Sequence, residues 1–178
     1  MFSIPIIGVI ESGANKGIQI SRNNKIAVLG TSATIRSNAY GKRIKAIKPE
    51  TSVISQACPL FVPLAEEGWV EGEIPNQIAE HYLSKIKRDG IDTVILGCTH
   101  YPLLEKIIKK SLGKDVNLVD SGDAVVKNVI STLRKVDGFS SNQDGVIKCY
   151  VTDDPFLFNN IARRFCLKKT EQAIQIDL

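Results

Sequence analysis

Residues 91–104, IDTVILGCTHYPLL, carry an apolar, β-branched run that ends in a glycine, a thiol, a hydroxyl and an imidazole. The first half of this stretch predicts a buried strand, and the apolar periodicity over 101–112 predicts a helix. A buried strand that passes through a short polar loop into a helix is typical of a parallel α/β fold. The stretch therefore places Cys98, Thr99 and His100 at the carboxyl end of a strand, where α/β proteins bind ligands.

The same alternation of strand and helix patterns runs through the rest of the chain. Further short β-branched runs predict strands at 25–29, 52–55, 116–119 and 146–151. Between them, apolar periodicity predicts helices at 33–47, 59–67, 73–88 and 122–136. The third of these helices ends at Asp89-Gly90, which is a C-terminal capping signal. We predict an α/β fold with a parallel sheet flanked by helices and joined by right-handed crossovers.

Three of the predicted strands end in a similar way. LGTSAT (29–34), LGCTH (96–100) and VDSG (119–122) each pass from an apolar strand into small or polar residues that open a helix. Because the carboxyl ends of parallel strands lie at one edge of a sheet, we expect the three loops to share one ligand-binding crevice. The exposed N–H groups of helix starts suit a carboxylate or a phosphate. An equally good explanation, helix N-capping, applies to Thr31, Ser32 and Ser121.

The composition is that of a globular protein without a nucleic-acid or membrane signature. The 178 residues hold 23 Lys and Arg against 19 Asp and Glu, and this charge is spread along the chain, so we predict no nucleic-acid partner. No apolar run approaches the roughly 20 residues of a membrane span. The four cysteines form no C-x-x-C pair, which disfavours a disulfide framework and favours a cytoplasmic location. We also predict no metal site, because His81 is the only histidine besides His100 and offers no ligand pattern.

Cys98 and His100 together suggest thiol chemistry. A thiol with the ordinary pKa of about 8.5 is only slightly ionised at neutral pH. The helix start that follows and a protonated His100 would both favour the thiolate. We therefore predict that the pKa of Cys98 is lowered and that Cys98 is alkylated before Cys58, Cys149 and Cys166. The alternatives are a buried structural cysteine and a Cys–His nucleophile for acyl transfer.

A second polar intrusion occurs in residues 57–67, ACPLFVPLAEE. Cys58 stands directly before a proline and is expected to be a packing residue. Glu66 and Glu67 close the apolar segment, and one of them could turn toward the crevice. The sequence leaves both carboxylates open as candidates.

These motifs resemble those of glutamate racemase, in the cofactor-independent aspartate/glutamate racemase superfamily. VILGCTHYPLL (94–104) is very similar to the second cysteine motif of that family. Other stretches follow the family's order along the chain: PIIGVIESGA (5–14), VLGTSATIRSNAY (28–40), ACPLFVPLAEEG (57–68), LVDSGDAV (118–125) and YVTDDPFLFNNIARRF (150–165). The resemblance covers essentially the whole chain.

The resemblance implies a mechanism in which two cysteines face opposite sides of the substrate Cα. One removes the α-proton as a thiolate, and the other returns a proton as a thiol, without a cofactor or a metal. It implies that Cys98 deprotonates L-glutamate, that His100 assists this transfer and that Glu66 is an acidic residue on the same side. The implied substrate contacts are Thr99, His100 and Thr34. The D-glutamate formed would supply peptidoglycan synthesis.

The chain departs from the family on its N-terminal side. The family's first Asp-Ser-Gly strand, its Pro-Tyr-Gly loop and the Cys-Asn-Thr motif of the first cysteine are missing, and the Asp-Ser-Gly at 120–122 matches a later motif. We therefore expect the chain to correspond to the C-terminal two-thirds of a racemase and to be inactive alone. Residues 1–118 would form the second α/β domain, and residues 119–178 would be an incomplete C-terminal part of the first domain.

Two alternatives to this interpretation concern the substrate and the activity. The chain could be an aspartate racemase-like enzyme, although the GCTHYP motif favours glutamate. It could also be a non-catalytic remnant that binds glutamate. The expected partner is the small-molecule substrate, and a homo-oligomer is compatible with the resemblance.

Overall fold

The computed structural model describes residues 4–141, 145–164 and 171–177. The chain divides into two compact units, Met1–Asp137 and Gly138–Leu178, and each is considered by itself. In the part of the chain that the structure describes, no helix combines the length and the apolar character that a bilayer crossing requires.

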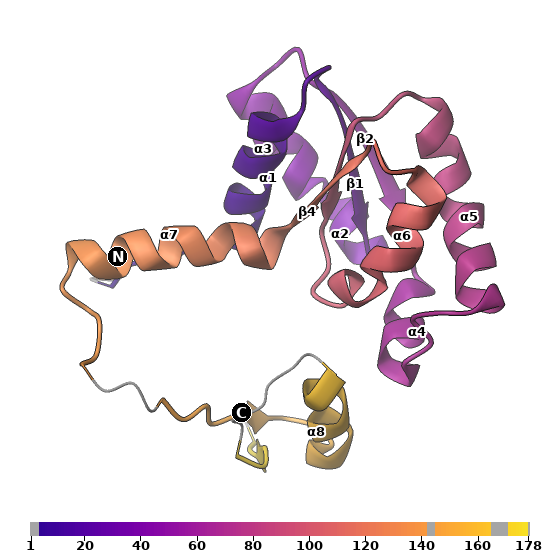
Figure 1. The fold of residues 1–178 in the computed structure, drawn as a ribbon. Coiled ribbons are helices and arrows are strands. Elements are labelled where there is room, and N and C mark those ends of the chain that lie inside the picture. The colour runs from indigo at the N-terminus through magenta and orange to yellow at the C-terminus, as the bar shows by residue number, and fades with distance from the viewer. Residues whose placement is uncertain (1–3, 142–144, 165–170, 178) are drawn as a thin grey trace. The chain divides into compact units, whose positions relative to one another are not determined.

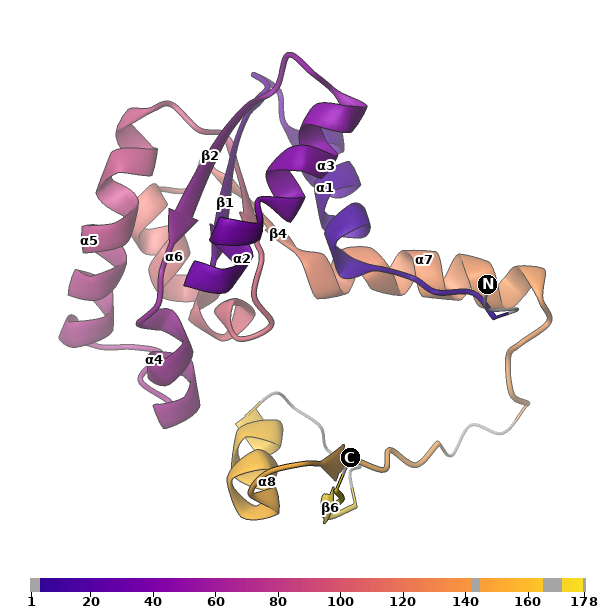
Figure 2. The same cartoon turned by 180° about the vertical axis from the view of Figure 1, so that it is seen from behind.

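The first unit is built on a four-stranded parallel sheet (Figures 1 and 2). The strands lie in the order β2-β1-β3-β4, with bounds β1 Lys25–Gly30, β2 Ser52–Ala57, β3 Thr93–Leu96 and β4 Asn117–Asp120. All three pairings are parallel, and helices connect the strands in sequence. The predicted fold class, a parallel sheet flanked by helices, is therefore confirmed.

Helices cover both faces of this sheet. One face carries α1 (Val9–Ile20) and α3 (Ala39–Ile47), and the other carries α5 (Glu73–Arg88) and α6 (Glu105–Leu112) (Figure 1). The first core joins Ile26, Val28, Ile95 and Val119 of the sheet to Ala14, Tyr40 and Ile44. The second core joins Ala27, Leu29, Val94 and Leu96 to helix residues that include Phe61, Leu83, Tyr101 and Ile108. Successive residues of β1 therefore face opposite cores, as the pleat of a strand requires.

Short helices gather near the carboxyl ends of the strands. They are α2 (Ser32–Ser37), α4 (Phe61–Glu67) and the 3-10 helix η1 (Tyr101–Leu104). The helix predicted over 33–47 is interrupted, because Asn38 adopts a left-handed conformation (φ 51°) that ends α2 before α3 begins. The helix predicted over 101–112 opens with η1 before it continues as α6.

Helix α1 is not predicted by the apolar periodicity of the sequence. The residues that it buries are Ser12, Gly13, Ala14 and Gly17. A Cβ atom on Gly17 would lie 2.8 Å from Ile95 Cδ1, and one on Gly13 would lie 2.5 Å from Ser121 Oγ. These small residues let α1 lie close against the sheet and the start of the helix that begins at Ser121. A face without large side chains gives no apolar pattern.

Helix α7 (Ser121–Lys135) follows β4 and packs against α1. In both views it extends beyond the sheet (Figures 1 and 2). Ser121 is its only buried residue, and Val126 and Val129 are 51% and 37% exposed. The amphipathic pattern predicted for this segment is therefore present in the helix, where Val125, Ile130 and Leu133 are partly buried while Val126 and Val129 are exposed.

The second unit contains one helix and two short strands among its described residues. Strands β5 (Tyr150–Val151) and β6 (Ile174–Gln175) pair in parallel, and α8 (Pro155–Arg164) lies between them in the sequence. Cys166 lies outside the described residues. The first compact unit continues past residue 118 to include α7, and the assignment of 119–178 to an incomplete first racemase domain stays a prediction.

Candidate active site

The loops after all four strands of the sheet open at one edge. The register pairs Gly30 with Ala57, Leu29 with Leu96, and Leu96 with Asp120. Since the pairings are parallel, the residues that follow these positions leave the sheet on the same side. The three polar strand ends therefore lie at one edge of the sheet, and that they share one ligand-binding crevice stays a prediction.

Cys98, His100 and Glu66 form a connected group at this edge. Cys98 Sγ lies 4.0 Å from His100 Nδ1, and His100 Nε2 lies 3.3 Å from Glu66 Oε1. Thr99 Oγ1 lies 3.4 Å from His100 Nδ1. The imidazole thus stands between a thiol and a carboxylate, which is an arrangement that can hold the ring in place and pass a proton toward or away from sulfur.

The structure distinguishes the two adjacent glutamates at the end of α4. Glu66 is half-buried and contacts His100, whereas Glu67 is exposed. Helical geometry separates neighbouring side chains by about 100° around the axis, so only one of the two can face the loop after β3. Glu66 is the one that does.

Cys98 is partly buried, and its environment disfavours the thiolate. Burial raises the pKa of Cys98 above its ordinary value, and the charge of Glu66 adds to the increase. The backbone N–H groups of His100 and Tyr101 donate to the sulfur and oppose this shift without cancelling it. The prediction of a lowered pKa for Cys98 is therefore wrong, because desolvation of the charged form outweighs the donors at the turn.

Thr34 lies in the first turn of α2, the short helix that follows β1. Its hydroxyl oxygen is 3.1 Å from that of Thr31, and its backbone N–H donates to Thr31 Oγ1 at 3.2 Å. Thr31 is therefore the N-cap of α2, which agrees with the capping interpretation of its hydroxyl given above. The start of α7 is capped by Asp120, which accepts from the N–H of Gly122, so the capping explanation does not apply to Ser121.

Cys58 is a packing residue, as predicted. Its side chain is fully buried, and burial raises the pKa of its thiol to about 12. Its carbonyl oxygen accepts a hydrogen bond of 2.9 Å from Tyr101 Oη, and Tyr101 packs edge-to-face on Phe61. These contacts attach the loop after β3 to the loop after β2.

No group of three or more His, Cys, Asp or Glu side chains that could hold a metal ion occurs among the described residues. The candidate chemistry at this edge is that of a thiol, an imidazole and a carboxylate.

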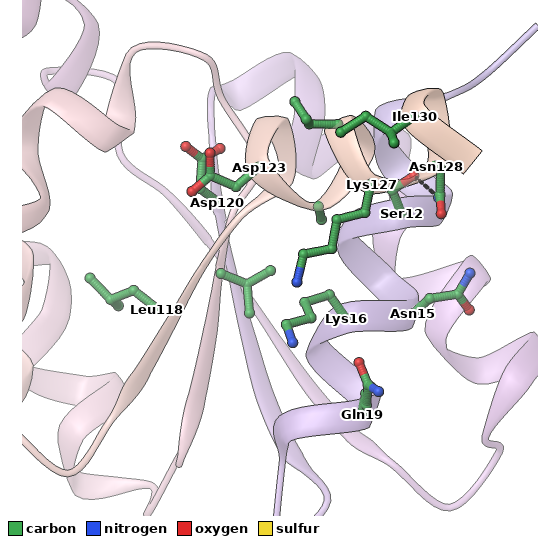
Figure 3. Close-up of a pocket in the computed structure, with 13 residues that line it drawn as sticks. Ser12, Asn15, Lys16, Gln19, Leu118, Asp120, Asp123, Lys127, Asn128 and Ile130 are labelled. Atoms are coloured by element: carbon green, nitrogen blue, oxygen red, sulfur yellow. Dashed lines mark hydrogen bonds between the residues drawn. The ribbon is translucent and has the colours of Figure 1, made fainter. Parts of the chain in front are cut away.

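A hollow lies beside the edge strand β4 and between α1 and α7 (Figure 3). Its volume is about 830 Å³, and Lys16 and Lys127 point into the same space from the two helices. Cys98, His100 and Glu66 do not line it. None of the predicted site residues belongs to this hollow. It is formed where α1 and α7 pack against each other, and no local sequence motif predicts such a contact.

Comparison with known proteins identifies the family. The sequence profile of the Asp/Glu/Hydantoin racemase family matches residues 1–129. The chain belongs to this family.

Two relatives illustrate the similarity in sequence. The glutamate racemase of Geobacter metallireducens is 43% identical over 177 residues, which are 99% of this chain and 66% of the relative. The glutamate racemase of Aquifex pyrophilus is 51% identical over 139 residues, which are 78% of this chain and 53% of the relative. The chain thus spans at most about two thirds of the length of the curated relatives it matches.

Solved structures of the family match the fold. A glutamate racemase isoform from Bacillus anthracis matches with a TM-score of 0.91 at 34% identity. The matched region is 99% of this chain and 66% of the Bacillus anthracis chain. The glutamate racemase of Francisella tularensis, solved in complex with D-glutamate, gives 0.88 at 34% identity over 98% of this chain and 65% of that structure.

Proposed function

We propose that this chain takes part in the interconversion of L- and D-glutamate by proton transfer at Cα, with Cys98 as one of the two thiol groups. The observation that carries the proposal is the Cys98–His100–Glu66 group at the carboxyl edge of the sheet. Its relatives are glutamate racemases, and one of them is solved with D-glutamate. No cofactor enters the proposed reaction.

In the proposed mechanism the Cys98 thiolate removes the α-proton of L-glutamate. His100 lies within reach of the sulfur and can accept or supply the thiol proton, while Glu66 orients the ring through Nε2. Thr99 and Thr34 would contact the substrate, together with His100. The raised pKa of Cys98 makes its thiol a weaker acid. Once formed, the Cys98 thiolate is correspondingly a stronger base toward the α-proton of the substrate.

Racemisation needs a proton donor on the face of Cα opposite Cys98. The 178 residues contain no Cys-Asn-Thr sequence, and of the other described cysteines Cys58 is fully buried and Cys149 belongs to the second compact unit. We therefore propose that the chain alone exchanges the α-proton of L-glutamate with solvent but does not form D-glutamate. A separately supplied segment that bears a thiol on the opposite face should restore racemisation.

The test is incorporation of solvent deuterium into L-glutamate. Cys98→Ser should lower the incorporation rate by about 10²–10⁴-fold, the contribution typical of a positioned acid–base group. Cys149→Ser, in the second compact unit, is the matched control and should leave the rate unchanged. Formation of D-glutamate by the chain alone would overturn the one-thiol proposal, and equal rates in both variants would remove Cys98 from the mechanism.

The two adjacent glutamates provide a matched pair of variants. Glu66→Gln removes the charge that faces His100 Nε2 and should lower the exchange rate by roughly tenfold. Glu67→Gln changes the charge by the same amount on the exposed side of α4 and should have no effect on the rate. Equal losses in the two variants would mean that net charge, and not the contact with His100, matters.

The proposal extends to substrate, location and assembly. L-aspartate should exchange more slowly than L-glutamate, and the reverse order would favour an aspartate racemase-like function. Covalent acylation of Cys98 by an ester would favour acyl transfer, and binding of glutamate without exchange would favour a binding remnant.

We also propose a reducing, cytoplasmic location, since Cys58, Cys98 and Cys149 are free thiols. The proposed role is to supply D-glutamate for peptidoglycan. A homo-oligomer stays a prediction.

A further inference from the structure

A chain of buried hydroxyl groups ends at Leu96, the last residue of β3, two residues before Cys98. Tyr40, on α3, is 4% exposed, and its Oη lies 2.9 Å from Ser121 Oγ. Ser121, the first residue of α7, is 6% exposed, and its Oγ lies 3.2 Å from the carbonyl oxygen of Leu96. Because a carbonyl oxygen only accepts, Ser121 donates its single proton to Leu96 and accepts from Tyr40.

The ring of Tyr40 also packs against Gly97, the residue directly before Cys98. A Cβ atom at Gly97 would lie 3.1 Å from Tyr40 Cε2 and 2.9 Å from the carbonyl oxygen of Leu29. The Gly97 N–H donates to that same Leu29 carbonyl at 2.8 Å. The backbone just ahead of Cys98 is therefore held between the neighbouring strand and Tyr40.

The other end of the Cys98 loop is anchored separately. Tyr101 Oη donates to the Cys58 carbonyl, and the Tyr101 ring is fully buried. The three residues between the anchors are those proposed to meet the substrate and its proton. A short loop fixed at both ends keeps the direction of its side chains, which proton transfer to a carbon atom requires.

We propose that Tyr40 and Ser121 are positioning residues for Cys98, which they hold in place by hydrogen bonding and packing at Leu96 and Gly97. This inference rests on the proposed function only for its effect on exchange. Its effect on the thiol itself is independent of any substrate. Burial raises the pKa of Tyr40, which keeps its hydroxyl protonated and able to donate.

The first experiment measures the thiol without glutamate. Titratable groups near Cys98 are Glu66 of α4, His100 and Tyr101 of its own loop, and Tyr40 of α3, whose own neighbours include Asp120 of β4. Burial is the main cause of the raised pKa of Cys98, so a loosened loop that admits water should move it back toward its ordinary value. In Tyr40→Phe and Ser121→Ala, the pH midpoint of Cys98 alkylation should fall by about half a unit or more.

Tyr150→Phe is the control, since Tyr150 is exposed and belongs to the second compact unit. Far-ultraviolet circular dichroism of each variant should match that of the unchanged chain, which establishes that the sheet is intact. An unchanged alkylation midpoint in both Tyr40→Phe and Ser121→Ala would overturn the inference, whatever the chain does to glutamate.

The second experiment uses deuterium incorporation into L-glutamate. In Tyr40→Phe we expect kcat to fall by roughly tenfold while KM stays within about twofold, because the substrate contacts remain and the base is misdirected. An equal loss through KM alone would overturn the positioning role. Absence of exchange in the unchanged chain would overturn the proposed function, and the alkylation midpoints would then decide the inference on their own.

Discussion

Helices α5 and α7 have similar lengths and similar amphipathic patterns, yet they are covered very differently. α5 has 16 residues and buries Pro75, Ala79, Leu83 and Ile86 against the sheet and α6. α7 has 15 residues and buries only Ser121. Its apolar side chains at 126 and 129 remain exposed, although the pattern that predicts the helix is equally clear.

The difference shows that periodicity specifies a helix face but not the surface that covers it. α5 lies between two strands of the sheet in sequence and returns to it, so its apolar face meets a surface made by the same unit. α7 leaves the edge strand β4 and contacts mainly α1. Most of the stability of an amphipathic helix comes from packing of its face, so the two helices should differ in local stability.

The largest expected difference is in backbone hydrogen exchange. Amides in the centre of α5 and in β3 should exchange at least about 10³-fold more slowly than those in the second half of α7, because the latter can open without unfolding the sheet. Exchange measured by mass spectrometry on the intact chain tests this. Equal protection in 91–97 and after residue 119 would mean that α7 and the second unit are already complete, contrary to the predicted incomplete domain.

Side-chain truncation should reproduce the contrast in equilibrium stability. Leu83→Ala removes a fully buried side chain of α5 and should lower the free energy of unfolding by about 2–5 kcal/mol. Val129→Ala, in α7, removes a side chain that is partly in water and should cost less than about 1 kcal/mol. Urea unfolding of both variants measures the two values, and similar losses would contradict the difference in packing.

Asp92, at the amino end of the sheet, should make a smaller contribution to the free energy of unfolding, and this contribution should depend on pH. Burial alone would raise its pKa, but hydrogen bonds from the Ser21 hydroxyl and from the N–H groups of Arg22 and Asn23 outweigh it and lower the pKa. The folded-state pKa then lies below the unfolded one, so this stabilisation is present above about pH 4 and disappears as the pH falls through the folded value.

Because Asp92 is only partly buried and solvent screens its charge, Asp92→Asn should lower the free energy of unfolding by no more than about 1 kcal/mol at pH 7 and by less at pH 3. Asp123→Asn, on the exposed first turn of α7, is the matched control and should show a change below about 0.5 kcal/mol at either pH. A loss at Asp92 that does not shrink on acidification would show that its hydrogen bonds, and not its charge, provide the stabilisation.

The smallest expected effect on the free energy of unfolding is that of a substitution at Val126, an exposed residue of α7. Val126→Lys should change the free energy of unfolding of the chain by no more than about 0.5 kcal/mol, because the side chain is already half in water. Ala79→Lys, at a fully buried position of α5, should unfold the first unit. A marked loss in Val126→Lys, measured by urea unfolding, would show that this face is covered in solution.

Some features of the site also required the fold. Cys98, His100 and Thr99 could be selected from their order after a strand, because a parallel sheet brings such positions to one edge. The choice between Glu66 and Glu67 could not, since it depends on the angle at which α4 meets the loop after β3. The pKa of Cys98 was predicted with the wrong sign because the sequence shows the neighbouring donors and charges but not how much water the fold removes.

The sequence by itself determined the alternation of strands and helices, the parallel sheet and the family motifs, because these depend on local periodicity and on the order of residues along the chain. Only the tertiary structure decided that Gly13 and Gly17 form a close-packed helix face, that Tyr40 and Ser121 meet beside the Cys98 loop, and that α7 buries no residue except Ser121. Each of these depends on contacts between segments far apart in sequence, and such contacts leave no periodic trace in either segment alone.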